Sequence, residues 1–202
     1  MNLFERAKNI LITPKTEWEV IKNEQTSVSD LFTKYVLILA LIPAVCTFIG
    51  QSLIGISFGP FGSFKVPIGS GLLYFVLYYL FSVVAVYLLA LIVDALAPSF
   101  GSTKDMIASL KVVVFSYTAA WVAGIFMILP LLSWLAAIGS LYALFLMYLG
   151  LKIIKAPPQD KLVGYFIVVI IVAIVIYFII GMIVGAIALG GMMMDAFKGM
   201  QY

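Results

Sequence analysis

The sequence predicts an all-α integral membrane protein, a bundle of five transmembrane helices preceded by short amphipathic helices. Three observations predict this fold class. Of the 202 residues, 64% are apolar and only 10% are charged, whereas soluble domains are about 25% charged. The mean hydropathy is +1.19. The apolar residues also fall into runs of about 20, the length that a helix needs to cross the hydrocarbon core of a bilayer.

Residues 1–30 are predicted to form a cytoplasmic amphipathic helical segment. Apolar residues at helical spacing indicate one short helix over 2–12. Thr13 stands where the N-cap of a second helix is expected, because Pro14 suits the first position of a helix. In this second helix Glu17 is expected to face water together with the lysines around it.

The apolar face of this segment is the candidate contact surface. The segment holds four basic and five acidic side chains, which argues against a polybasic clamp on anionic lipid. The face therefore lies in the membrane interface, docks on the cytoplasmic ends of the bundle, or binds a partner protein. Simple docking at the membrane interface is favoured over partner recognition. Its residues are Leu3, Phe4, Ile10, Leu11, Pro14, Trp18 and Ile21.

The membrane domain is predicted to cover residues 31–202, with a capping box at Ser27 and Asp30 leading into its first span. Pro43 removes a backbone hydrogen bond in the middle of span one. Pro130 separates the third span from the fourth so closely that the two must form a tight antiparallel hairpin. The fifth span is longer than a bilayer needs and is expected to tilt or project. The predicted spans cover residues about 35–56, 71–93, 112–129, 131–151 and 162–189.

Positive charge is distributed unevenly about these spans. Ten of the 12 lysine and arginine residues precede span one or lie in the loops after spans two and four. Lys65 and Lys198 lie on the other side. The positive-inside rule therefore predicts a cytoplasmic N-terminus and a C-terminus outside. No cleavable signal is expected, because the polar first 30 residues lack the pattern of one.

Three polar residues near or within the spans form the candidate intramembrane polar site. Asp94 ends span two, Lys111 opens span three, and Gln51 lies near the outer end of span one. One interpretation makes Asp94 and Lys111 an ion pair or proton site at the cytoplasmic mouth of the bundle. The favoured interpretation places both at the membrane interface, with Lys111 snorkelling and Asp94 hydrated or capping a turn.

Small residues recur at helical spacing on two spans. Ser116, Ala120 and Gly124 stand four positions apart on span three, and Gly181 and Gly185 form a Gly-x-x-x-Gly motif on span five. Such stripes let helix backbones approach closely in lipid. The first stripe is interpreted as packing within the chain, whereas a dimer face gains weight on span five. Both are candidate helix-packing or oligomer faces.

The residues on which many catalytic and metal sites depend are missing from the sequence. It contains no histidine, and its one cysteine, Cys46, lies in span one. This excludes Ser-His-Asp and Cys-His catalysis and histidine zinc sites. We therefore expect a protein that is not an enzyme, with no catalytic residue, cofactor or metal. The lysines beside apolar runs indicate topology rather than nucleic-acid binding.

Three stretches carry a family resemblance: "RAKNILITPKTEWEVIKNEQTSVSDLFTKYVLILALIPAVCTFIG", "FGSTKDMIASLKVVVFSYTAAWVAGIFMILP" and "LYALFLMYLGLKIIKAPPQDKLVGYFIVVIIV". In this order and spacing they resemble the Yip family, named for interaction with Ypt/Rab GTPases. The resemblance covers nearly the whole chain. It implies a five-span bundle with a cytoplasmic N-terminus and, in eukaryotic relatives, a role in membrane traffic through GTPase binding and assembly with other Yip-type proteins.

The chain is more similar to the short prokaryotic members of the family, which implies a location in a prokaryotic cytoplasmic (inner) membrane. A GTPase partner is implied only by the family resemblance. We expect a non-enzymatic multi-pass membrane protein of the Yip type that organises membrane partners or lipids, in membrane traffic or membrane homeostasis. Its expected partners are the lipid bilayer and copies of itself or other membrane proteins. The alternative is an oligomeric transporter or channel for a small solute or ion, with its path lined by Pro43, Gln51, Asp94 and Lys111.

Overall fold

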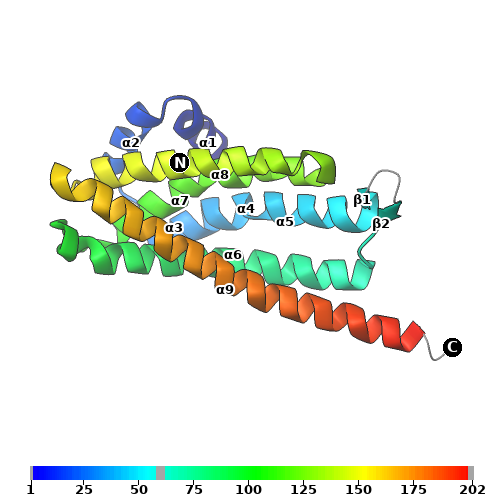
Figure 1. Cartoon of the computed structure of the whole chain (residues 1–202). Coiled ribbons are helices and arrows are strands. Elements are labelled where there is room, and N and C mark those ends of the chain that lie inside the picture. The colour runs from blue at the N-terminus through cyan, green and yellow to red at the C-terminus, as the bar shows by residue number, and fades with distance from the viewer. Residues whose placement is uncertain (1, 58–61, 200–202) are drawn as a thin grey trace.

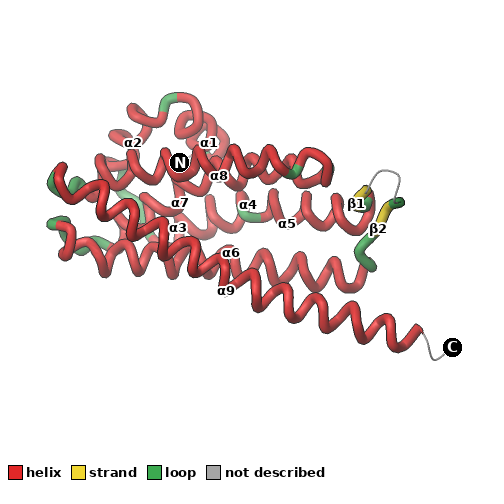
Figure 2. The backbone as a smooth tube through the Cα atoms, viewed as in Figure 1, coloured by secondary structure: helices red, strands yellow, loops and turns green. Residues whose placement is uncertain are grey.

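The computed structural model describes residues 2–57 and 62–199, and helices dominate this part of the chain (Figures 1 and 2). Its α-helices are α1 (Leu3–Ile12), α2 (Pro14–Asn23), α3 (Val28–Leu31), α4 (Leu37–Leu39), α5 (Leu41–Phe48), α6 (Ile68–Leu96), α7 (Met106–Ala123), α8 (Trp134–Gly150) and α9 (Gln159–Gly199). Strands β1 (Ile56–Ser57) and β2 (Ser63–Phe64) pair antiparallel, with Ile56 opposite Phe64.

Within the described residues, five helical stretches are long and apolar enough to cross a membrane, which confirms the predicted membrane fold. The helices continue through polar residues at which the predicted spans stop. Asp94 therefore lies inside the second stretch and Lys111 inside the third. The five stretches are Val28–Ile54, Ile68–Phe100, Met106–Ile128, Trp134–Lys155 and Gln159–Ile187.

The bundle has two different ends. Helices α1 and α2, here called the N-terminal helix pair, lie beside α7 and α8 toward one end, which we call the polar end (Figure 1). Strands β1 and β2 lie at the other end, which we call the strand end. The connections from α6 to α7 and from α8 to α9 are also at the polar end, where the helix pair contacts α7 and α8.

The helix starts near the N-terminus are partly those predicted. Pro14 is the first residue of α2, and the hydroxyl of Ser27 accepts a hydrogen bond from the N–H of Asp30 at 3.0 Å, which confirms that cap. Thr13 precedes α2, but its hydroxyl donates to the carbonyl of Asn9 at 3.2 Å. Thr13 is thus the N-cap residue of α2, as predicted, but its side chain makes no capping bond, because the hydroxyl is bonded to the preceding helix.

The first spanning stretch is irregular. Two π-helical segments, Phe32–Val36 and Ile49–Ile54, lie on either side of α4 and α5, and a turn at Ala40 separates those two helices. The turn is three residues before Pro43, which has no N–H to bond the preceding turn of the helix. The irregular stretch ends at Ile54, near the strand end, and its last π-helical segment contains Gln51.

Helix α7 forms the centre of the bundle. It packs most extensively against α8 and also contacts α5 and α6. A Cβ atom added to Gly139 would lie 2.1 Å from the Cβ of Ala123, and one added to Gly124 would lie 2.6 Å from the Cβ of Pro43. Glycine is needed at both crossings because any side chain would push the helices apart. Helices α7 and α8 thus form the predicted tight antiparallel hairpin.

Helix α9 is the least enclosed element. It packs along α6, contacts α8 little, and then runs beyond the rest of the bundle (Figure 1). Only 17% of its most apolar stretch is buried inside the protein, against 56% for α7. This agrees with the prediction that a span of such length projects. Its distal part presents an apolar surface that the chain itself does not cover.

Candidate functional site

Charged side chains gather inside the polar end of the bundle, where they are paired with one another or with backbone groups. Two neighbouring groups can be distinguished, and each is named after one member. The Asp94 cluster consists of Asp94, Asp105, Ser109 and Lys155. The Arg6 cluster consists of Arg6, Glu17, Glu24 and Lys111.

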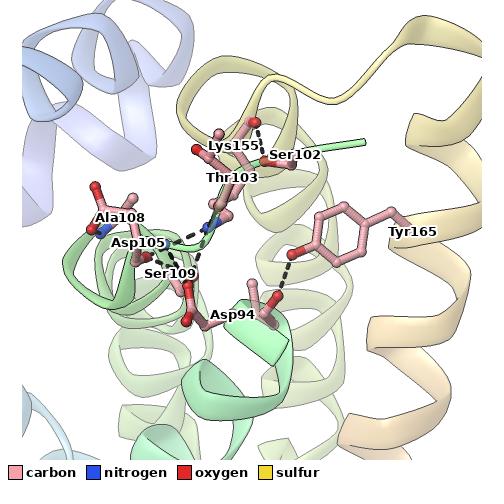
Figure 3. Close-up of polar contacts among 9 residues, drawn as sticks. Asp94, Ser102, Thr103, Asp105, Ala108, Ser109, Lys155 and Tyr165 are labelled. Atoms are coloured by element: carbon pink, nitrogen blue, oxygen red, sulfur yellow. Dashed lines mark hydrogen bonds and ion pairs between the residues drawn. The ribbon is translucent and has the colours of Figure 1, made fainter. Parts of the chain in front are cut away.

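Asp94 receives donors from three segments of the chain (Figure 3). Its Oδ1 accepts hydrogen bonds from the backbone N–H of Asp105 at 2.7 Å and from the hydroxyl of Ser109 at 3.1 Å. The Nζ atom of Lys155 lies 3.4 Å from the same oxygen and also donates to the carbonyl of Thr103 at 2.7 Å. The Lys155 side chain is only 1% exposed. A buried ammonium group needs such a counter-charge and acceptors, so Asp94 holds Lys155 in place.

Two chain reversals bring these groups together. Gly101, at a left-handed φ of 74°, turns the chain after α6, and Asp105 then caps α7 by accepting from the N–H of Ala108 at 3.0 Å. The hydroxyl of Ser102 in this turn donates at 2.5 Å to the carbonyl of Lys155, the last residue of the π-helical segment Leu151–Lys155 that follows α8. The turn between α6 and α7 is therefore bonded directly to the end of the fourth spanning stretch.

Helix α9 joins the same cluster through Tyr165. Its hydroxyl donates to the carbonyl of Val93, the residue before Asp94 (Figure 3). Its ring also stacks on Phe100, with 4.9 Å between centroids. Tyr165 is fully buried. The cluster thus connects the second, third, fourth and fifth spanning stretches at the polar end.

The Arg6 cluster fastens the N-terminal helix pair to the bundle. The guanidinium of Arg6 pairs with both Glu17 and Glu24. The Nζ atom of Lys111, on α7, donates to the carbonyls of Ile21 at 2.8 Å and Glu24 at 2.5 Å. These carbonyls lie at the C-terminal end of α2, where a helix leaves acceptors unpaired and favours a cation.

An aromatic layer lies beneath this cluster. The fully buried ring of Trp18 meets Phe115 edge to face at 6.4 Å between centroids, and Tyr35 meets the same ring at 5.0 Å. The hydroxyls of Tyr35 and Thr118 are hydrogen-bonded at 2.8 Å. A Cβ atom added to Gly150 would lie 2.9 Å from the Trp18 ring, so this glycine makes the space that the indole fills.

The arrangement can hold the helix pair, both connections and α9 as one unit. Removing one member of a buried pair leaves the other charge without compensation, which is far more destabilising than losing an exposed pair. Within the part of the chain that the structure describes, no group of three His, Cys, Asp or Glu residues could hold a metal ion.

The contact surface predicted for the N-terminal segment is mostly covered. Ile10, Trp18 and Ile21 are 0% exposed because they pack into the core formed with α7 and α8. The remaining predicted residues, Leu3, Leu11 and Pro14, are half-buried, and Phe4 alone is 74% exposed. Of the three alternatives predicted for this surface, the burial of Ile10, Trp18 and Ile21 agrees with docking on the bundle.

The predicted intramembrane polar site is not assembled. Asp94 pairs with Lys155, while Lys111 bonds the carbonyls of α2, so the hypothesis of an ion pair between Asp94 and Lys111 is corrected. Lys111 is 7% exposed and does not snorkel. Gln51 lies toward the strand end, at the opposite side of the bundle. The three residues therefore do not line one path.

The small-residue stripes have different surroundings. Ser116 is fully buried and its hydroxyl donates to the carbonyl of Val112 at 2.6 Å, and Gly124 meets Pro43 as described above. Ala120 lines a cavity between the helices. At Gly181 and Gly185 an added Cβ would meet nothing within 4 Å among the described residues. The stripe on α7 thus faces the interior, whereas the stripe on α9 has no partner among the described residues.

Several members of the two clusters were not singled out from the sequence. Glu17, which was expected to face water, is 7% exposed, because it lies on the buried face of α2 between Pro14 and Ile21. Arg6 stands four positions before Ile10 and so shares its buried face. Two successive helices thus carry opposite charges, Arg6 and Glu17, on their apolar faces. This pattern is the signal that could have indicated the cluster.

Comparison with known proteins agrees with this architecture. Residues 8–183, well over half of the chain, match the Yip1 domain. The chain is also similar to the inner membrane protein YohC of Escherichia coli, with 30% identity over 142 residues, which cover 68% of this chain and 72% of that protein. The same values hold for the YohC protein of E. coli O6:H1. No solved structure matches the chain.

Proposed function

The chain belongs to the Yip1 domain family, and from this premise we propose that it is a non-enzymatic membrane protein that organises other membrane proteins through its fifth span. It is an integral membrane protein, and its described residues include five helical stretches that are long and apolar enough to cross a membrane. The finer role proposed is assembly, either of copies of this chain or with other multi-pass proteins. The inner membrane is the proposed location, since the E. coli relatives carry that description.

The observation that carries this proposal is the uncovered distal part of α9. Phe178 is 66% exposed and Met182 is 55% exposed. Gly181 and Gly185 lie between such residues and leave a shallow strip along the helix, with nothing of the chain within 4 Å of their added Cβ positions. Helices associate in lipid by close backbone approach at small residues, so this strip suits a second helix.

The polar end supports the same proposal by its rigidity. The Asp94 and Arg6 clusters hold four of the five spans and the helix pair together, so the first part of α9 is anchored while its distal part extends. An extended helix on a rigid base can meet a partner without rearrangement of the bundle. We place the polar end on the cytoplasmic side, because ten of the 12 basic residues belong to it.

The test is the state of association in a bilayer. Purified protein, labelled with one dye per chain, is reconstituted at several protein-to-lipid ratios and counted by single-molecule photobleaching. We expect assemblies that grow with density, and weakening by about tenfold when Gly181 and Gly185 are both changed to Leu, as losing about 1.4 kcal/mol of association would give. Ile167→Leu, an exposed change on the anchored part of α9, is the matched control.

A chain that stays monomeric at every density would contradict the self-assembly form of the proposal. Equal association of the wild type and the double variant would show that α9 is not the surface used. Topology is checked separately by attaching a reporter before Leu3, which should be accessible only from the cytoplasm. An outside location would overturn the orientation proposed here.

A further inference from the structure

Two adjoining cavities lie inside the bundle, away from the clusters at the polar end. The first, of about 280 Å³, is near the strand end, and its lining includes Gln51, Ile56, Tyr74 and Ser133. The second, of about 370 Å³, lies deeper and is formed by residues of α5, α6, α7, α8 and α9. Tyr78 and Met127 line both cavities, so they form the wall between the two. We call them the polar cavity and the apolar cavity.

The polar cavity presents hydrogen-bonding groups that are not engaged within the protein. The side-chain amide of Gln51 and the hydroxyls of Tyr74 and Tyr78 have no hydrogen-bond partner among the described residues. A polar group inside a membrane protein is unfavourable unless it is bonded. Three such groups at one cavity therefore indicate an occupant, or ordered water, that bonds to them.

Small side chains open the apolar cavity. Ala120, Ala136, Ala143 and Ala173, from three helices, line it together with larger apolar residues. Ala120 belongs to the stripe on α7 that is interpreted from the sequence as packing, yet here it borders a hollow. Its volume is in the range of about 300–1,000 Å³ that is usual for small-molecule sites.

The apolar cavity opens toward lipid between α8 and α9. Ser140 on α8 and Ile174 on α9 both line it, and both are exposed, Ile174 to 63%. These two helices contact each other little, because α9 packs along α6 instead. An acyl chain in the surrounding bilayer can therefore reach the cavity from the side, without passing through water.

None of the described residues that line either cavity is charged. An anionic or cationic head would find no counter-charge there, whereas hydroxyl and ester groups match an amide and phenol hydroxyls. Because the strand end is one end of the spanning stretches, the polar cavity is expected near a membrane surface and the apolar cavity toward the middle of the bilayer. This is the orientation of a lipid in the adjacent leaflet.

We propose that the two cavities together form a binding site for one uncharged single-chain lipid of the monoacylglycerol class. Its glycerol ester occupies the polar cavity, bonded by Gln51 and Tyr78, and its acyl chain passes Met127 into the apolar cavity. Met127 suits this position because its side chain is flexible and apolar. The site is separate from the distal face of α9, so this inference does not depend on the assembly proposed above.

The test uses a monoacylglycerol that carries a photoreactive diazirine in the middle of its chain. The full-length protein in lipid nanodiscs is irradiated with this probe, and labelled residues are mapped by mass spectrometry. We expect saturable labelling of cavity residues such as Met147 and Tyr177, removed by excess unmodified monoacylglycerol. Gln51→Leu should weaken the apparent affinity about fivefold, as expected for the loss of one hydrogen bond.

Two matched variants on α9 separate the cavity from the lipid-facing surface. Ala173→Phe places a ring in the apolar cavity and should abolish the saturable labelling, whereas Ala186→Phe, on an exposed part of the same helix, should leave it unchanged. If Ala173→Phe does not fold, Ser140→Trp at the mouth replaces it, with the same expectation.

Three outcomes would overturn the proposal. Labelling confined to lipid-facing residues such as Met182 would show that the probe contacts only the outer surface. If saturable labelling of Met147 persists in folded Ala173→Phe or Ser140→Trp, the acyl chain of the probe does not depend on the apolar cavity. Equal labelling of the cavity by a phosphatidic acid carrying the same diazirine chain would contradict the preference for an uncharged head.

Discussion

The N-terminal helix pair and the distal part of α9 make an instructive comparison. Both carry apolar residues and both were predicted as contact surfaces. In the helix pair, Ile10, Trp18 and Ile21 are fully buried against α7 and α8. In α9, by contrast, Gly181 and Gly185 meet nothing of the chain within 4 Å. One surface is therefore used inside the protein and the other is not.

The difference follows from the solvent that each segment meets. An apolar face at the membrane surface is partly exposed to water, so covering it with the bundle is favourable. Arg6 and Glu17 lie on the covered faces and pair there, which fixes the position of the pair. A helix within lipid gains nothing from hiding apolar side chains, so α9 can leave its face open until a helix of suitable shape arrives.

The largest effect is expected from removing the central charge of the helix pair. Arg6→Met leaves Glu17 and Glu24 without their cation and should destabilise docking by about 3 kcal/mol, as is typical when one partner of a buried pair is lost. Limited trypsin digestion should then cut at Lys15 and Lys22 much faster. Lys8→Met, an exposed change on the same helix, is the control and should leave digestion unchanged. Unaltered digestion of Arg6→Met would mean that the pair is held without this cluster.

The Asp94 cluster should show the next effect. Asp94→Asn keeps an acceptor for the N–H of Asp105 but leaves Lys155 without a counter-charge, so we expect about 2 kcal/mol of destabilisation in unfolding from detergent. Asp30→Asn removes an exposed pair with Lys34 and should change stability by about 0.5 kcal/mol or less. Equal effects of the two variants would show that burial of the cluster is unimportant.

A pair of glycine variants compares the packed interior with α9 directly. Gly139→Ala forces a Cβ to within 2.1 Å of the Cβ of Ala123 and should destabilise the protein by about 2 kcal/mol. Gly181→Ala meets no obstacle and should leave stability unchanged or raise it by up to about 1 kcal/mol, because alanine favours a helix. Thermal unfolding in the same detergent measures both. A destabilising Gly181→Ala would reveal a contact of α9 within the chain.

The smallest effect is expected in the aromatic layer. Tyr35→Phe removes the hydrogen bond to Thr118 but keeps the edge-to-face contact with Phe115. We expect a loss of about 1 kcal/mol in the free energy of unfolding, with the helix pair still protected from trypsin. Faster digestion of this variant would show that the layer, and not the Arg6 cluster, controls docking.

The features that could be predicted from the sequence depend on local residue patterns and on the length of apolar runs. The five spans follow from apolar length, the start of α2 from Pro14, and the capping box from Ser27 and Asp30. The pairing of Asp94 with Lys155 could not be predicted, because the two residues are 61 positions apart and meet only through two turns. The bonds of Lys111 likewise depend on where α2 lies on α7. The apolar cavity opens where α8 and α9 contact each other little, and no local spacing of residues predicts how far apart two helices lie.

Cysteine crosslinking in native membranes tests most directly whether the helix pair belongs to the bundle while distal α9 meets other chains. In a Cys46→Ser background, Gly181→Cys and Ile12→Cys each place one thiol on an exposed apolar position of the two regions. On mild oxidation, Gly181→Cys should form a disulfide-linked dimer, or a mixed disulfide with another membrane protein, and Ile12→Cys should remain monomeric. Crosslinking through Ile12→Cys with none through Gly181→Cys would contradict the account.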